Sequence, residues 1–126
     1  MKYGVINENH LFVKCYHKGK KIVTKRVVVF VLEDKHARFL KKSHPDKIKI
    51  NRVGISVTKK LGGAVQRNRA KRIIRAAYGT LCQDLKTGFL IVISARGAIE
   101  GKKSPQVAEE LVLDFTKLGL LSKSER

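Results

Sequence analysis

The sequence predicts a single α/β domain, built as an α+β sandwich around a central mixed sheet. The chain has 126 residues, of which 43% are hydrophobic, and this is enough for one domain with a core of its own. Segments with helical periodicity alternate with short apolar or β-branched runs, in the order αβββαβα. We therefore expect residues 1–126 to form one domain, with about 119–126 as a C-terminal tail.

The first half of the chain carries one helix and a set of strands. Asn9 can cap a helix from His10 to Lys18, which Gly19 ends. The β-branched residues of Lys25–Glu33 predict a strand. The polar segment Asp34–Lys49 follows and is expected to form a loop.

The second half alternates strand and helix. Ile50–Thr58 alternates apolar and polar positions, as a half-buried strand does. Strong helix formers fill Ala64 to about Cys82, and Gly88–Ala95 is a continuous apolar run typical of a buried strand. Pro105 suits the first turn of a last helix, which we expect to reach about Leu118.

The charge is large and unevenly distributed. Lys and Arg number 28 against 10 Asp and Glu, which gives a net charge of +18. No acidic residue lies between Asp46 and Asp84. Ten basic residues fill this stretch: Lys47, Lys49, Arg52, Lys59, Lys60, Arg67, Arg69, Lys71, Arg72 and Arg75. A segregated surface of this kind favours a polyanionic partner, because each neutralised phosphate releases counterions.

The predicted helix over 64–82 divides into an apolar and a basic side. The apolar stripe consists of Ala70, Ile73, Ile74, Ala77 and Leu81, and Asn68, Lys71, Arg72 and Arg75 lie opposite it, with Arg67 and Arg69 at the two edges. Like charges four residues apart destabilise a helix, so we expect a bound anion to relieve them. Lys59 and Lys60 precede the helix, followed by a Gly62-Gly63 turn that lets a backbone approach closely.

The first predicted helix carries two aromatic residues on one face. Phe12 and Tyr16 are four residues apart and are therefore neighbours on the helix surface. Aromatic side chains beside basic ones can stack on the bases of a single strand. Aromatic residues at helical spacing also commonly pack in a core, and the residues alone leave both interpretations open.

The residues that could perform catalysis or bind metal form no recognisable site. The acidic residues are scattered without a two-metal spacing, and His10 and His17 have no evident partner. Cys15 and Cys82 are far apart and show no zinc-binding spacing, which favours reduced thiols and an intracellular location. The sequence shows no signal-peptide pattern, no apolar run long enough to span a membrane and no Walker loop. We predict no catalytic residue and no metal ligand.

One continuous segment resembles a known family. The residues from Gly54 to Arg72 read GISVTKKLGGAVQRNRAKR, and they resemble the signature of the bacterial ribonuclease P protein subunit. The resemblance covers nearly the whole chain, including the strand GFLIVISAR and the closing LGLL. One departure is Gly63, where the family often has Asn.

The resemblance implies a fold and a function. The fold would be that of domain 2 of ribosomal protein S5, with a left-handed β-α-β crossover. The function would be that of the protein subunit of an endoribonuclease that removes the 5′ leader from precursor tRNA, with the chemistry on an RNA subunit that uses Mg²⁺. We would then expect a cytoplasmic protein, bound as a monomer to its RNA.

The resemblance also implies two sets of binding residues. The catalytic RNA would be bound by Lys59, Lys60, Arg67, Asn68, Arg69, Lys71, Arg72 and Arg75. A cleft for the leader would contain Phe12, Lys14, Tyr16, Lys18, Lys25 and Phe30. The alternative function is that of a ribosomal or other structured-RNA-binding protein without a role in cleavage, which composition fits equally well.

Overall fold

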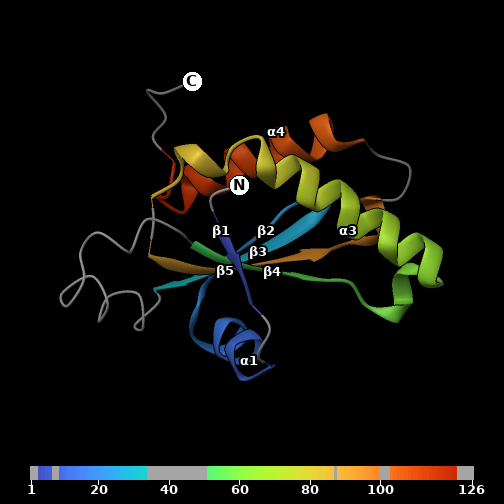
Figure 1. Ribbon diagram of the computed structural model, residues 1–126, viewed down its shortest axis with the longest axis horizontal. Helices are drawn as coiled ribbons and strands as arrows, with labels where there is room; N and C mark the ends of the chain where they lie inside the picture. Colours follow the sequence, from blue (N-terminus) through green and yellow to red (C-terminus); the bar gives the residue numbers. More distant parts are fainter. Residues whose placement is uncertain (1–2, 7–8, 34–50, 87, 100–102, 122–126) are drawn as a thin grey trace.

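The centre of the molecule is a mixed five-stranded sheet (Figure 1). A computed structural model describes residues 3–6, 9–33, 51–86, 88–99 and 103–121. The strands are β1 (Tyr3–Val5), β2 (Lys20–Val23), β3 (Val27–Glu33), β4 (Asn51–Ser56) and β5 (Phe89–Ala95), in the spatial order β1-β4-β5-β3-β2. Strands β1, β4 and β5 are mutually parallel, whereas β3 is antiparallel to β5 and to β2.

The helices form a layer on each face of the sheet. Helix α1 (Asn9–Lys18) lies on one face, and α3 (Ala64–Gly79) and α4 (Ser104–Lys117) pack against each other on the other face (Figure 1). Within the described residues, short 3-10 turns connect the elements: η2 (Lys59–Leu61), η3 (Cys82–Asp84) and η4 (Gly97–Ile99). The result is the predicted α+β sandwich.

Two apolar clusters hold the layers together. The larger one lies under α3 and α4, where Ile74, Ile91 and Phe115 are completely buried. The smaller one lies under α1, where Leu11 and Cys15 pack on the other side of β5. Because residues of β5 alternate between the two clusters, this strand is buried on both faces, which explains its continuous apolar sequence.

The predicted elements are present with small shifts of their boundaries. The strand expected from Lys25 begins at Val27, because Lys25 and Arg26 form the turn after β2. The helix expected to reach Cys82 ends at Gly79, and a 3-10 turn continues the chain. The predicted loop Asp34–Lys49 lies outside the described residues. The left-handed sense of the β4–α3–β5 crossover stays a prediction of the family resemblance.

Several features were missed by the sequence analysis, including the position of strand β2 (Lys20–Val23), for which it named no residues. Strand β1 (Tyr3–Val5) adds to the sheet beside β4, in a parallel pairing that no local pattern announces. Leu120 and Leu121 fall in the predicted C-terminal tail, yet both are buried in the larger cluster. The core therefore extends beyond the end of α4.

Candidate RNA interface

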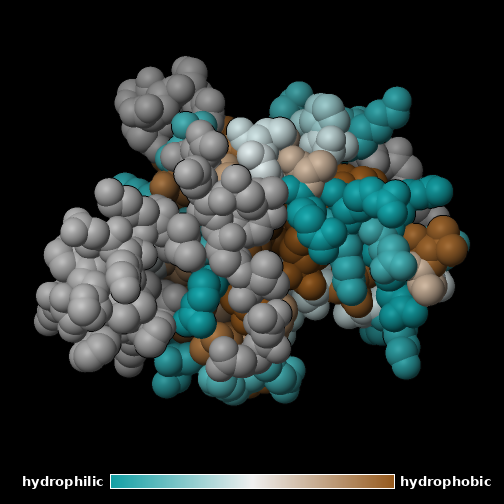
Figure 2. Space-filling model, in the orientation of Figure 1, coloured by the Kyte–Doolittle hydropathy of each residue, from teal (hydrophilic) through white to brown (hydrophobic). Residues whose placement is uncertain are grey.

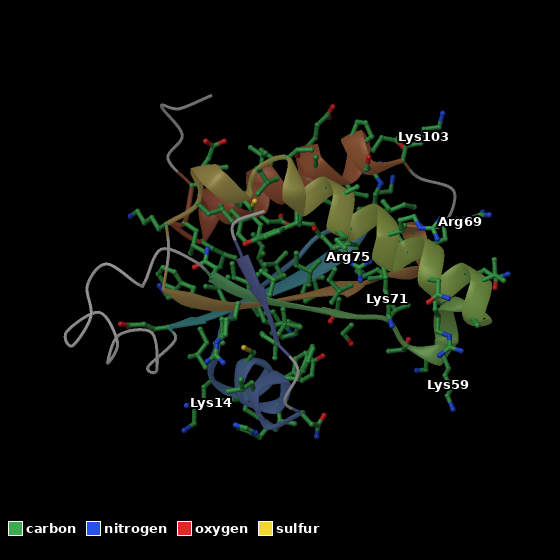
Figure 3. All side chains as sticks on the ribbon, viewed as in Figure 1. Lys14, Lys59, Arg69, Lys71, Arg75 and Lys103 are labelled. Atoms are coloured by element: carbon green, nitrogen blue, oxygen red, sulfur yellow. The ribbon has the colours of Figure 1, made fainter. Side chains whose placement is uncertain are left out.

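Helix α3 presents a basic face to solvent at one end of the sheet. Its buried side consists of Ala70, Ile74, Ala77 and Tyr78. Asn68, Arg69, Arg72 and Arg75 are exposed, and Arg67 and Lys71 are half-buried. Figure 3 shows Arg69, Lys71 and Arg75 along the helix, and Figure 2 shows hydrophilic residues gathered over this part of the molecule. The predicted separation of apolar and basic sides is thus present.

The connection before α3 extends this basic face. Lys59 and Lys60 are exposed in η2, and Figure 3 shows Lys59 below the start of α3. Gly62 has a φ of 138°, a conformation that side-chain-bearing residues rarely adopt, and it turns the chain into the helix. The first turn of α3 contains no acidic residue and no side chain caps it, so no negative charge of this turn competes with an anion at its N-terminus.

Arg67 is held differently from the other arginines of the helix. Its Nε atom is buried and has no hydrogen-bond partner in the described part of the chain. The residue as a whole is half-buried. An arginine with its stem fixed loses less entropy when it binds a phosphate than a freely rotating one does.

Three aromatic rings form a connected set on the opposite face of the sheet. The centroids of Tyr16 on α1 and Phe30 on β3 are 4.9 Å apart in an edge-to-face arrangement. Phe12 lies one helical turn from Tyr16, with ring centroids 6.5 Å apart. Phe12 and Phe30 also pack against the smaller cluster, whereas the side chain of Tyr16 is 40% exposed. Phe12 and Phe30 thus contribute to the core, and Tyr16 is the ring most available to a ligand.

Beside α1, one row of residues across the sheet is accessible. It consists of Val23, Val28, Ser94 and Ser56, which the strand register places next to one another on β2, β3, β5 and β4. All four are partly or largely exposed, and we call this row the open sheet face. It lies on the α1 side of the sheet, because Val28 and Phe30 share one face of β3. The aromatic set and the open sheet face therefore lie on the same side of the sheet.

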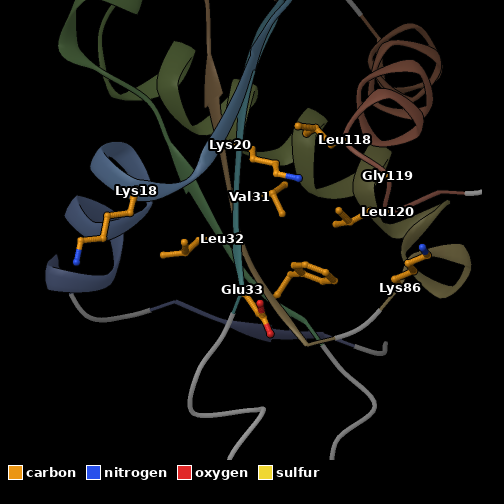
Figure 4. A pocket seen from close by; sticks show the side chains of 10 residues that line it. Lys18, Lys20, Val31, Leu32, Glu33, Lys86, Leu118, Gly119 and Leu120 are labelled. Carbon is orange, nitrogen blue, oxygen red and sulfur yellow. The ribbon is translucent and has the colours of Figure 1, made fainter.

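The three lysines predicted beside the aromatic set lie in different places. Lys14 is half-buried on α1, on the other side of the sheet from α3 (Figure 3). Lys25 is exposed in the turn between β2 and β3. Lys18 lines a pocket of about 490 Å³ at the opposite end of the strands from α3's first turn (Figure 4). The walls of that pocket include Lys20, Lys86, Phe89 and Leu120.

Helix α4 places a buried acidic pair against the turn between β2 and β3, a feature that the sequence analysis missed. Glu110 and Asp114 project from α4 and both contact the hydroxyl of Thr24, at 2.5 Å and 3.1 Å. Burial raises the pKa of Asp114 from 3.8 to about 6, and the nearby charge of Glu110 also raises it. The hydrogen bond from Thr24 and the charge of Lys117 lower this pKa, but by less. Arg26 pairs with Glu110 at 3.1 Å. These contacts join segments more than eighty residues apart, which a local sequence pattern does not reveal.

The described part of the chain offers neither a cluster of metal-binding side chains nor a membrane-spanning helix. Among its residues, no three His, Cys, Asp or Glu side chains are grouped so that they could hold a metal ion. None of the described helices is long and apolar enough to cross a membrane.

Comparison with known proteins decides the family. The family model described as Ribonuclease P matches residues 2–119. The chain belongs to the ribonuclease P protein family. The ribonuclease P protein component of Clostridium acetobutylicum is 35% identical over 126 residues, which are 100% of this chain and 98% of the relative. That of Clostridium botulinum strain 657 is 31% identical over 121 residues, covering 95% of this chain and 98% of the relative.

Solved ribonuclease P proteins share the fold. The Staphylococcus aureus protein superposes with a TM-score of 0.71 at 29% identity, covering 94% of this chain and 96% of that one. The Thermotoga maritima protein gives a TM-score of 0.67 at 24% identity, covering 84% and 89% of the two chains. The family assignment agrees with the resemblance carried by the segment from Gly54 to Arg72.

Proposed function

We propose that this chain acts as the protein component of ribonuclease P and binds both a catalytic RNA and the 5′ leader of precursor tRNA. The single observation that carries this proposal is the family match over residues 2–119. In the holoenzyme, the protein would serve as an accessory subunit in the endonucleolytic cleavage that produces the mature 5′ end of tRNA. It would act in the cytoplasm, one monomer for each RNA subunit.

The basic face of α3 supports the contact with the catalytic RNA. The face carries Arg69, Arg72 and Arg75 in exposed positions, and no acidic residue lies in the chain between Asp46 and Asp84. Planar guanidinium groups can bind phosphates in a bidentate manner or stack on bases. Repulsion among these charges would be relieved when RNA phosphates bind.

The aromatic set and the open sheet face support the contact with the leader. Tyr16 offers an exposed ring on the same side of the sheet as the accessible residues Val23 and Val28. Single-stranded nucleic acid is commonly bound by such rings together with nearby positive charges. Lys14 and Lys25 supply those charges on α1 and on the β2–β3 turn.

In this proposal, the Mg²⁺ ions belong to the RNA subunit. Bound there, they would activate the attacking water and stabilise the leaving oxygen of the cleaved phosphodiester. The residues of this chain would bind and orient the two RNAs and neutralise their phosphates. That division of labour allows cleavage at a lower Mg²⁺ concentration, because the protein replaces part of the counterion charge.

Reconstitution tests the proposal. The purified protein is freed of RNA by nuclease treatment and mixed with the catalytic RNA of its own organism and a precursor tRNA. We expect leader cleavage at low Mg²⁺ only when the protein and the RNA are both present. Cleavage by the protein alone would contradict the accessory role, and the absence of any effect on rate or Mg²⁺ requirement would contradict the proposed function. The latter result would favour a structural RNA-binding protein.

A further inference from the structure

The pocket beside the start of β2 has the size of a small-molecule site. Its volume is about 490 Å³, within the range of about 300–1,000 Å³ that is typical of ligand pockets. It lies where β3 ends and β5 begins, and the residues Leu118–Leu120 that follow α4 form one of its walls. Three separate segments of the chain thus enclose a space that neither proposed RNA contact uses.

The floor of this pocket is apolar and includes one aromatic ring. Val31 and Leu120 are buried in the larger cluster, and Phe89 and Leu118 pack against that cluster while remaining partly accessible. These residues place the floor on the α4 side of the sheet, whereas the aromatic set lies on the α1 side. A planar ring of a ligand can stack on Phe89 or meet it edge to face. The floor therefore favours a ligand that contains a planar ring.

The walls of the pocket carry an excess of positive charge. Lys18, Lys20 and Lys86 stand against one acidic residue, Glu33, which leaves a net charge of +2. In the part of the chain that the structure describes, none of these three lysines forms an ion pair. Of the common small anions, a phosphate monoester has the matching charge of about −1.5 to −2 near pH 7. A monocarboxylate would balance half of the excess, and a zwitterionic amino acid would balance none.

Two of the lysines are positioned to share one anionic group. Lys20 pairs with Val31 across β2 and β3, so its side chain lies on the α4 side of the sheet. Figure 4 shows Lys20 reaching toward Leu118 and Lys86 on the other side of Leu120, whereas Lys18 points away from the floor. Each ammonium group has three N–H donors, and a phosphate monoester offers three strong acceptor oxygens.

We propose that this pocket binds a nucleoside monophosphate, with the base against Phe89 and the phosphate between Lys20 and Lys86. Glu33, exposed at the end of β3, can accept a hydrogen bond from an amino group of the base, since a carboxylate has about four lone-pair sites. The site is distinct from the basic face of α3 and from the open sheet face. It goes beyond the proposed function and does not depend on it.

Binding of AMP to the purified protein, freed of RNA, tests the assignment. Calorimetry compares AMP with adenosine, which lacks the phosphate, and with ribose 5-phosphate, which lacks the base. Each should bind at least tenfold more weakly than AMP, because each loses one of the two sets of contacts. IMP, which has a carbonyl in place of the amino group of AMP, should also bind more weakly. The methyl NMR signals of Val31, Leu118 and Leu120 should shift during the AMP titration.

Substitutions separate the two halves of the site. Lys20→Gln and Lys86→Gln should each weaken AMP binding about tenfold, a typical loss for a charge-assisted hydrogen bond, and leave adenosine binding unchanged. Lys21→Gln is the matched control, because Lys21 is exposed on the same strand but pairs with Phe30 and so faces the α1 side. It should bind AMP as the wild type does. Phe89→Leu should weaken AMP and adenosine by the same factor.

Four results would overturn the assignment. The first is the absence of AMP binding. The second is equal affinity for AMP and ribose 5-phosphate, which would show only a general attraction of anions to a protein with a net charge of +18. The third is an equal loss in Lys20→Gln and Lys21→Gln. The fourth is displacement of AMP by the catalytic RNA, which would place the pocket in the RNA interface. None of these results bears on leader cleavage, which reconstitution tests separately.

Discussion

The ring of Phe12 lies directly over Gly54, across the boundary between α1 and the sheet. A Cβ atom on Gly54 would be 2.5 Å from Cζ and 2.6 Å from Cε1 of Phe12. Real Cβ atoms do not come so close to a ring. The absence of a side chain at Gly54 therefore sets how closely α1 packs on the sheet. It also sets the position of the aromatic set.

Gly54→Ala should displace Phe12 and loosen α1. We expect the free energy of unfolding in urea to fall by about 1–3 kcal/mol, as for other overpacked sites. Gly79→Ala is the matched control, because nothing lies within 4 Å of a Cβ at that position. Its stability should be unchanged or higher by up to about 1 kcal/mol. An equal loss in both variants would show that Phe12 does not limit the packing.

Tyr16→Ala should weaken binding of leader-bearing precursor tRNA. Stacking on one base is worth about 1–3 kcal/mol, so the dissociation constant should rise about tenfold or more, and the affinity for mature tRNA should stay constant. The neighbouring Val13 is also exposed, at 43%, and Val13→Ala provides the control on the same helix. A similar loss in the two variants would argue against a stacking role for Tyr16.

Arg69→Ala should weaken binding of the catalytic RNA. Loss of one phosphate contact to a duplex region lowers the slope of log affinity against log salt by about 0.9. Lys117→Ala removes an exposed charge from the end of α4 and should leave both affinity and slope unchanged. If Arg69→Ala also loses discrimination between leader-bearing and mature tRNA, the basic face of α3 and the leader surface are not separate.

Asp114→Asn should change how stability depends on pH. The pKa of Asp114 is about 6 in the folded protein, against 3.8 without burial, so the folded state binds more protons between these values. Wild-type stability should therefore fall by up to about 3 kcal/mol as pH rises from 4 to above 6. Asp114→Asn should lack this fall, whereas Glu109→Gln, at an exposed neighbouring position, should retain it. Urea unfolding at pH 4, 5, 6 and 7 measures the difference.

Local patterns predicted most of the fold correctly. The apolar stripe that includes Ala70 and Ile74 fixes one side of α3 against the core, so the basic residues between them must face outward. The continuous apolar run of β5 indicates a strand buried on both faces, and Ile91 and Val92 lie in different clusters. In both cases the information lies within one segment.

Long-range contacts could not be predicted in the same way. The charge pattern of α4 shows Glu110 as one of several acidic residues on a helix, and nothing local indicates that it holds a turn formed by Thr24 and Arg26. Arg96 follows a strand and resembles any surface arginine until the register places it at that turn. Such residues become recognisable only when distant segments are brought together.

Strand β4 sets the distance between the aromatic set and the basic residues that precede α3. Gly54 lies under the aromatic set, Ser56 ends the open sheet face, and Lys59 begins the basic approach to α3. Hydrogen-bonded neighbours on both sides keep β4 extended. A strand of RNA on one face of the sheet and a folded RNA against α3 would thus be held at a set separation. The protein would thereby fix the distance between the folded catalytic RNA and the single-stranded 5′ leader of the precursor tRNA.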